Sequence, residues 1–103
     1  MESRELRLTP KAQSDLQDIW LYGAETWSPA QADIYLEALG QRFDALCSMP
    51  TMAREYAEFT PPVRIHPSGP HVIIYVFDEA HLDVIRVLGG RQNWRAILEA
   101  IET

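Results

Sequence analysis

The stretch that decides the fold is residues 63–94, VRIHPSGPHVIIYVFDEAHLDVIRVLGGRQNW. Its three apolar runs are separated by two turn sequences, which predicts three consecutive antiparallel strands. The middle run, 72–77, is apolar on both faces and is expected at the centre of the sheet. Four arginines and all three histidines of the chain lie between residues 61 and 95. A sheet that carries several cationic side chains in an acidic protein is expected to bind a partner or ligand.

The residues before this stretch predict one short strand and two helices. Residues 4–9 alternate apolar and polar side chains, the pattern of a half-buried strand. Thr9-Pro10 and Ser28-Pro29 are both helix start signals, because a hydroxyl can cap the first turn and proline fits there. Met49-Pro50 ends the second helix, because the residue before a proline is held out of the helical region. The connection around Trp27 is so short that the helices must form an antiparallel hairpin.

The order of these elements predicts an α+β fold of the form β-α-α-β-β-β(-α). A small antiparallel sheet, joined by the first strand, packs against the N-terminal helical hairpin, and its other side is left partly open. A short helix with Asn93 as its cap closes the chain. Residues 51–62 show no clean period and are expected to form an irregular surface loop. At 103 residues, 1–103 is expected to be a single domain.

Composition narrows the classes of function. The formal net charge of −6 argues against general nucleic-acid binding, because proteins that bind phosphate backbones usually carry a basic excess. The single cysteine, Cys47, is expected in the core rather than as a reactive thiol. No apolar run approaches the ~18 residues of a membrane span, and the N-terminus lacks a signal-peptide pattern, so a cytoplasmic protein is expected.

The sequence predicts no metal site and no cofactor. His66, His71 and His81 do not share one helical face, and no cysteine or carboxylate cluster accompanies them. Gly89-Gly90 follows a strand but lacks the rest of either nucleotide-binding fingerprint. These glycines are interpreted as the turn that ends the last strand.

Arg86 lies in an apolar strand, on the predicted face of Val84 and Leu88. A charge at such a position is costly unless it is paired or reaches a wet groove. The alternative to binding is an internal salt bridge, with Asp83, Glu99 or the 54–58 loop as candidate partners. Both interpretations stay open for Arg86, and also for Arg64 on the neighbouring strand.

Arg91 is predicted to bind a partner, because two preceding glycines let the backbone and a partner approach closely. Together with Arg64 and Arg86 it forms a predicted cationic strip that suits carboxylates or phosphates. Trp94 is interpreted as the anchor of the final helix on the sheet, with an exposed aromatic at a binding edge as the alternative.

A series of short motifs runs along the chain. The motifs are Leu8-Thr9-Pro10-Lys11-Ala12, Asp15-Leu16, Ile19-Trp20, Ser28-Pro29, Arg64-Ile65-His66-Pro67, His71-Val72-Ile73-Ile74-Tyr75, Ile85-Arg86-Val87-Leu88 and Gly90-Arg91-Gln92-Asn93-Trp94. In this order they resemble the ParE-type toxins of the RelE/ParE superfamily of bacterial toxin–antitoxin systems. The resemblance covers nearly the whole chain and is weakest over 51–62.

The resemblance implies the same β-α-α-β-β-β fold and a cytoplasmic toxin of a type II system that stabilises plasmids or chromosomes. It also implies neutralisation by a cognate ParD-like antitoxin in a hetero-oligomer. ParE members poison DNA gyrase by binding it and are not known for chemistry of their own. RelE members instead cleave mRNA in the ribosome with strand cations and a C-terminal aromatic or base.

The residues favour the ParE alternative. A nuclease needs cations at the scissile phosphate and a group that moves the proton of the ribose hydroxyl. The C-terminal helix has no tyrosine, and Trp94 and Ile97 cannot act as acid or base. No catalytic residue is therefore predicted; the minority nuclease candidates are His66, His71 and Arg91. A degenerate toxin that only binds its antitoxin is a further alternative.

The antitoxin is expected to have an acidic C-terminal segment that is partly disordered when free. This segment would lay apolar residues along the open groove between helices and sheet, with its acids toward the cationic strip. The predicted antitoxin- or target-binding residues are Arg64, His66, His71, Arg86, Arg91 and Trp94.

Overall fold

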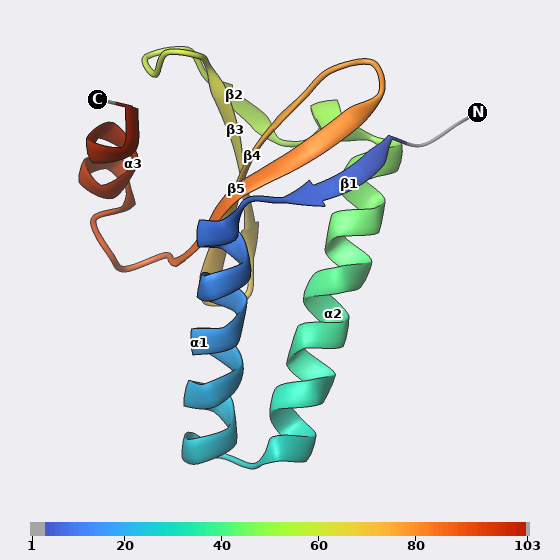
Figure 1. Cartoon of the computed structure of the whole chain (residues 1–103), viewed down its shortest axis with the longest axis vertical. Coiled ribbons are helices and arrows are strands. Elements are labelled where there is room, and N and C mark those ends of the chain that lie inside the picture. The colour runs from blue at the N-terminus through green and yellow to red at the C-terminus, as the bar shows by residue number, and fades with distance from the viewer. Residues whose placement is uncertain (1–3, 103) are drawn as a thin grey trace.

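The computed structural model describes residues 4–102. In chain order its elements are β1 (Glu5–Leu8), α1 (Pro10–Thr26), α2 (Pro29–Ser48), the 3-10 helix η1 (Pro50–Met52), β2 (Arg54–Tyr56), β3 (Val63–Ser68), β4 (His71–Phe77), β5 (His81–Gly89) and α3 (Trp94–Glu102). Figure 1 shows α1 and α2 side by side as an antiparallel hairpin, with α3 set apart from both. The predicted α+β fold is confirmed, with β2 as an additional strand.

The helix limits follow from local capping. The Thr9 hydroxyl accepts a hydrogen bond from the Ala12 N–H at 3.1 Å, and the Ser28 hydroxyl accepts one from the Gln31 N–H at 3.1 Å. A proline follows each cap residue at the start of its helix, where its missing N–H costs nothing. Each cap satisfies an N–H group that the helix itself leaves unpaired.

The sheet has the strand order β1-β5-β4-β3-β2, so β4 is central as predicted. The pairs from β2 to β5 are antiparallel, but β1 pairs with β5 in parallel, with Leu6 opposite Leu82. The prediction of a wholly antiparallel sheet is therefore wrong for β1. A hairpin turn forces neighbouring strands to be antiparallel. Between β1 and β5, however, the chain forms two α-helices, the 3-10 helix η1 and three strands before it returns.

Residues 51–62 are an irregular loop only in part: residues 51–52 belong to η1 and 54–56 to β2, and 57–62 have no helix or strand. Arg54 to Tyr56 pair with Ile65 to Val63 as the edge strand β2, and Phe59 is 3% exposed. A strand of three residues is too short to show an alternating pattern. Its pairing with β3 forms the strand, so the sequence of the segment alone did not reveal it.

A bulge in β5 changes which residues share a face. Ile74 pairs with Arg86, but the next residue of β4, Tyr75, pairs with Val84, so Ile85 is the extra residue. One inserted residue moves all later side chains to the opposite face. Val84 packs in the cluster under the helices and Leu88 in the cluster on the other face, so the prediction that Arg86 shares one face with both is wrong.

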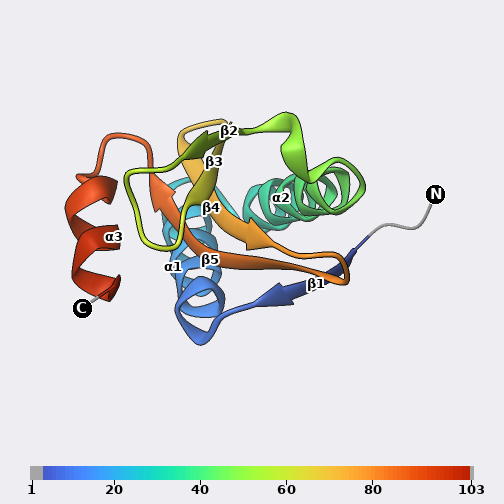
Figure 2. The ribbon, with the colours of Figure 1, turned by 90° about the horizontal axis from the view of Figure 1, so that it is seen from above.

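Each face of the sheet carries its own buried cluster. The hairpin-side cluster is formed by Ala12, Leu39, Phe43, Leu46, Cys47, Ala53, Ile73, Tyr75, Leu82, Val84 and Val87. The second cluster is formed by Phe59, Val63, Ile65, Val72, Ile74, Leu88 and Leu98. Figure 2 shows α3 and α2 on opposite sides of the strands. The side expected to be partly open is thus covered in part by α3, and Cys47 lies in the core as expected.

Among residues 4–102, no helix has the length and apolar character needed to cross a membrane.

Candidate binding groove

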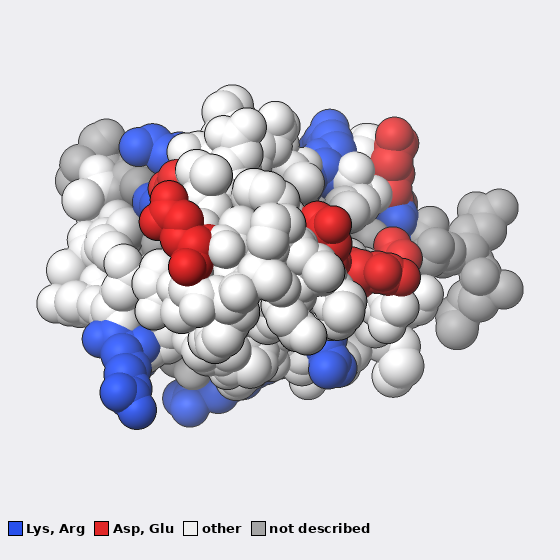
Figure 3. All heavy atoms as spheres, turned by 90° about the horizontal axis from the view of Figure 1, so that it is seen from below, with Lys and Arg blue, Asp and Glu red and all other residues white. Residues whose placement is uncertain are grey.

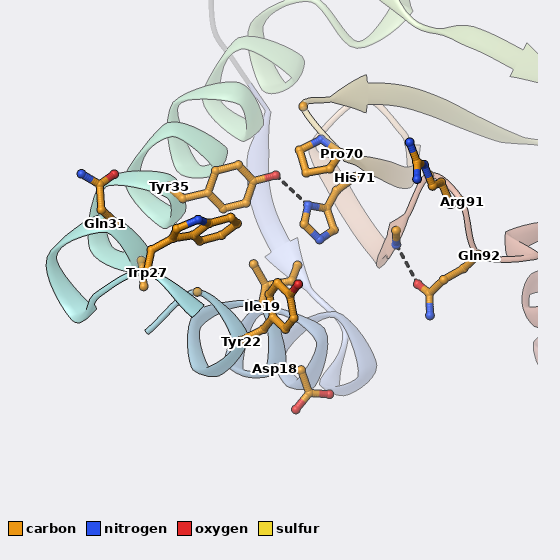
Figure 4. Close-up of a pocket in the computed structure, with 15 residues that line it drawn as sticks. Asp18, Ile19, Tyr22, Trp27, Gln31, Tyr35, Pro70, His71, Arg91 and Gln92 are labelled. Atoms are coloured by element: carbon orange, nitrogen blue, oxygen red, sulfur yellow. Dashed lines mark hydrogen bonds between the residues drawn. The ribbon is translucent and has the colours of Figure 1, made fainter. Parts of the chain in front are cut away.

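A groove of about 1010 Å³ lies between the helical hairpin and one end of the sheet. The hairpin wall carries Tyr22 and Trp27, which are 65% and 70% exposed. The sheet-side wall is formed by the β3–β4 turn and by the segment that follows β5, including His71 and Arg91. Figure 4 shows Tyr22 and Trp27 on the hairpin side of the hollow and His71 on the sheet side. Large exposed aromatic rings in a groove that is also lined by a cation are typical of a surface that receives a partner.

The aromatic wall depends on a close approach of the two helices at the hairpin tip. A Cβ atom on Gly23 would lie 3.3 Å from the Cβ of Ala32, so only a small residue fits there. Tyr22 and Trp27 then meet edge to face, with ring centroids 6.1 Å apart. Such pairs hold aromatic rings in place while leaving their outer faces in water.

The sheet-side wall is built from two backbone segments that bind each other. The Gly90 N–H donates to the Pro70 carbonyl at 2.8 Å, and the Gly89 N–H donates to Oε1 of Gln92 at 2.7 Å. Gly69 in the β3–β4 turn has φ 58°, a conformation that favours glycine. These contacts fix the backbone on both sides of Arg91, whose own side chain is exposed.

Tyr35 of α2 reaches across to the sheet at the inner end of the groove. Its hydroxyl oxygen lies 2.6 Å from Nδ1 of His71 and 3.3 Å from the Ser68 carbonyl oxygen. Burial lowers the pKa of His71 and raises the pKa of Tyr35. Both side chains are therefore held in their neutral forms near neutral pH.

Arg86 does not line this wall as a free cation. Its guanidinium makes two hydrogen bonds to the Asp15 carboxylate of α1, at 2.7 and 2.8 Å, which raise the pKa of Arg86. Asp15 also accepts the Val87 N–H at 3.0 Å. The salt-bridge alternative is the one the structure shows, but the partner is none of the three candidates; Asp83, for example, pairs with Arg7.

Arg64 and His66 also lie outside the groove. Arg64 donates to the Ala53 carbonyl at 2.7 Å, and its guanidinium lies 5.6 Å from the centre of the Phe77 ring. Burial, followed by the charge of Arg42, lowers the pKa of His66. Both residues come from the hairpin-facing side of β3, and neither is among the residues that line the groove.

Trp94 packs edge to face on Tyr56 with ring centroids 5.7 Å apart, beside the second cluster. It is thus placed as the anchor of α3 rather than as a groove residue. Of the six residues predicted to bind, the groove brings together only His71 and Arg91.

The sequence did not identify the aromatic side of the groove. The spacing of Tyr35 with Leu39 and Phe43 predicts a core face of its helix, and Trp27 marks only a short connection. An aromatic residue on a helical stripe is usually core. Only the arrangement of α2 against the β3–β4 turn shows that Tyr35 reaches the sheet.

Charge does not form one continuous field at the hairpin end of the molecule. Figure 3 shows this face dominated by uncharged atoms, with acidic and basic groups in small separate clusters. Of the three arginines of the predicted cationic strip, only Arg91 lines the groove. Within residues 4–102, no group of three or more His, Cys, Asp and Glu side chains could hold a metal ion.

The two partly buried histidines, His66 and His71, predict a pH dependence of stability. Burial lowers the pKa of His66 and of His71 below the ordinary value of 6.5. As the pH falls below 6.5, the unfolded chain takes up protons that the folded protein excludes, so the free energy of unfolding falls until the folded pKa is passed. Replacing both histidines with glutamine is expected to flatten the slope between about pH 7 and 5.5. Urea unfolding across this range measures it, and equal slopes for the variant and the wild type would contradict it.

Comparison with known proteins gives one consistent family. Residues 6–94 match the family model described as the ParE toxin of type II toxin-antitoxin system, parDE. The protein named Toxin ParE1 of Mycobacterium tuberculosis is 36% identical over 94 residues, which cover 90% of this chain and 95% of that protein. The Toxin ParE1 of Caulobacter vibrioides is 33% identical over 92 residues, covering 89% and 95%.

A solved structure agrees at the level of fold. It is described as the chromosomal ParDE TA system from P. aeruginosa, and it superimposes with a TM-score of 0.72 at 17% identity. The superposition covers 84% of this chain and 96% of that chain. Most of α3 lies beyond residue 94, where the match to the family model ends.

Proposed function

This chain belongs to the ParE toxin family and is the toxin of a type II toxin–antitoxin system, and from that membership we propose that it poisons DNA gyrase by binding rather than by catalysis. Its cognate antitoxin is proposed to be ParD-like. The C-terminal segment of that antitoxin is proposed to fill the groove between hairpin and sheet.

The observation that carries the antitoxin proposal is the chemistry of the groove. Exposed Tyr22 and Trp27 offer an apolar wall, and Arg91 offers a cation on the opposite wall. A segment with apolar side chains and an acid matches both walls. The net charge of −6 repels an acidic segment elsewhere on the body and so favours contact at this groove.

The positions of the strand cations support binding over phosphodiester cleavage. Stabilising a pentacoordinate phosphate requires cations that converge on one point. Here Arg86 is held by Asp15, and Arg64 is turned to the Ala53 carbonyl. His71 and Arg91 are the predicted candidates that remain in one groove.

Purified toxin at micromolar concentration is expected to inhibit supercoiling by DNA gyrase and to trap a cleavage complex. Preincubation with the cognate antitoxin should restore supercoiling. An antitoxin that binds the toxin while the gyrase reaction proceeds unchanged would mean that the target is another protein. Growth arrest on expression without the antitoxin distinguishes an active toxin from one that retains only antitoxin binding.

The alternative is a ribosome-dependent mRNA endonuclease, favoured by the presence of His71 and Arg91 in the same groove. In that case primer extension on translated mRNA would show cuts, and alanine at His66, His71 or Arg91 would reduce them. Intact messages in a cell that stops growing would eliminate this alternative.

A further inference from the structure

Three parts of the chain meet at the end of the molecule that lies away from the hairpin tip. Figure 1 shows the end of α2 and the start of β1 at this end. The Arg4 N–H donates to the Cys47 carbonyl at 3.1 Å, which joins the chain before β1 to α2. The Tyr75 O–H donates to the Pro50 carbonyl at 2.6 Å, which joins η1 to the centre of the sheet. These bonds hold the three parts as one surface.

Phe77, the last residue of β4, is contacted by two arginines at this surface. The guanidinium carbon of Arg4 lies 5.0 Å from the centre of the Phe77 ring, and that of Arg64 lies 5.6 Å from it. Nε of Arg4 also donates to the Asp78 carbonyl, and Nη1 of Arg64 donates to the Ala53 carbonyl at 2.7 Å. Two cations are therefore held around one ring by cation–π contacts and by backbone carbonyls.

Among residues 4–102, neither of these two arginines is paired with a carboxylate. Arg7, Arg86 and Arg95, in contrast, each form an ion pair with an acidic residue. Arg4 and Arg64 are partly buried, and a partly desolvated charge attracts an opposite charge more strongly than one in water does. A guanidinium has five N–H donors, and each of these two uses one of them for a backbone carbonyl. The other donors are available to an acidic partner.

Two large apolar side chains are exposed next to these cations. Met49 is 62% exposed and Met52 is 41% exposed, and the two residues bracket Pro50 and Thr51 at η1. Met52 directly precedes Ala53, the residue whose carbonyl binds Arg64. Methionine side chains are flexible and polarizable, and they are frequent on surfaces that bind other proteins. We call this set the Arg–Met surface; its members are Arg4, Met49, Met52, Arg64 and Phe77.

We propose that the Arg–Met surface binds an acidic patch on the cellular target of the toxin, which under the proposed function is DNA gyrase. A protein partner fits better than DNA, because only two cations surround the ring and the net charge of −6 repels a phosphate backbone. Met49 and Met52 offer apolar contacts that a phosphate backbone does not use. The inference rests on the proposed function for the identity of the target.

The Arg–Met surface is separate from the groove proposed for the antitoxin. None of its five residues lines that groove, whose sheet-side wall is formed by the β3–β4 turn and the segment after β5. Phe77 lies at the opposite end of β4 from His71, which is in the groove. Substitutions in the Arg–Met surface are therefore expected to weaken the contact with the target and to leave the contact with the antitoxin intact.

The first test is the dissociation constant of purified gyrase for the double variant Arg4→Gln, Arg64→Gln, which loses both charges. Binding is expected to weaken about tenfold or more, and added salt should weaken the wild type more steeply than the variant. Affinity for the full-length antitoxin should stay within about twofold of the wild type. Arg54→Gln is the matched control, because Arg54 lies 5.0 Å from the Tyr56 ring but on the edge strand β2. A double variant that binds gyrase as the wild type does would overturn the inference.

A second variant, Met49→Ser with Met52→Ser, tests the apolar half of the surface and leaves the partly buried arginines in place. Both methionines are exposed, so urea unfolding of this variant is expected to match the wild type. Its affinity for gyrase is expected to fall about tenfold. Unchanged affinity in this folded variant would show that the methionines do not contact the target.

Growth arrest in the absence of the antitoxin gives a measurement that does not depend on which protein is the target. If the wild-type toxin stops growth without binding gyrase, the proposed function is wrong. The Arg–Met surface is then supported if the double arginine variant no longer stops growth, and overturned if growth still stops.

Two further results would assign the surface to another partner. Loss of antitoxin binding in a double variant that unfolds as the wild type does would make it part of the antitoxin site. Weaker binding to the gyrase–DNA complex, with unchanged binding to gyrase alone, would mean that the two arginines contact DNA. Either result would overturn the assignment to an acidic protein patch.

Discussion

Asp15→Ala is expected to lower the free energy of unfolding by about 3–5 kcal/mol, because it breaks a buried ion pair by removing one partner. The Arg86 and Asp15 side chains are only 14% and 10% exposed, and Asp15 also accepts the Val87 N–H. Without the carboxylate, the guanidinium stays buried without its partner and a strand N–H loses its acceptor. Urea denaturation measures the change.

Two variants separate this mechanism from a general effect on α1. Asp18→Ala removes an exposed acid three residues farther along the same helix and is expected to change stability by less than about 0.5 kcal/mol. Asp15→Leu combined with Arg86→Met removes both charges and should recover most of the loss. A double variant as unstable as Asp15→Ala would show that the pair is not the cause.

Leu98→Ala is expected to destabilise the protein by about 2–4 kcal/mol. Leu98 is 2% exposed and is the residue by which α3 enters the second cluster beside Phe59 and Ile74. The remaining anchors of α3 are weaker, since Trp94 is only partly buried and the ion pair between Arg95 and Glu58 is about half exposed. Loss of Leu98 should therefore loosen the whole helix.

Amide hydrogen exchange resolves whether α3 detaches before the rest of the fold. The amides of α3 are expected to exchange faster in Leu98→Ala, while those of β4 keep their relative protection. Glu99→Ala changes the next, exposed position of the same helix and serves as the control. Unchanged exchange in α3 together with a small loss of stability would mean that Leu98 does not anchor the helix.

The helix limits and the central strand could be predicted because their causes are local. Thr9 and Ser28 cap helices through N–H groups three residues away, and Met49 precedes the proline that ends α2. The apolar run of β4 is buried on both sides whatever its neighbours are. The strand β2 could not be predicted, because three residues carry no period and the strand exists through its pairing with β3.

Only part of the candidate site could be predicted. His71 and Arg91 stood out as polar residues beside turns in an apolar segment. Asp15 is 71 positions from Arg86 in the sequence, and an acid on a helical stripe gives no sign of its partner. The place of Tyr35 in the groove could not be predicted either, because a core tyrosine and a groove tyrosine have the same spacing on a helix.

By itself, the sequence determined the order of the elements, their caps, the central strand and the family resemblance. These depend on backbone preferences and hydrogen bonds that act within a few residues. Only the tertiary structure decided which cationic side chains are paired within the fold and which line the groove. A one-residue bulge at Ile85 changes which residues of β5 share a face. Arg86 is paired with Asp15, and Arg91 lines the groove together with His71. Burial and ion pairing are set by residues distant in the chain, and packing alone brings those residues together.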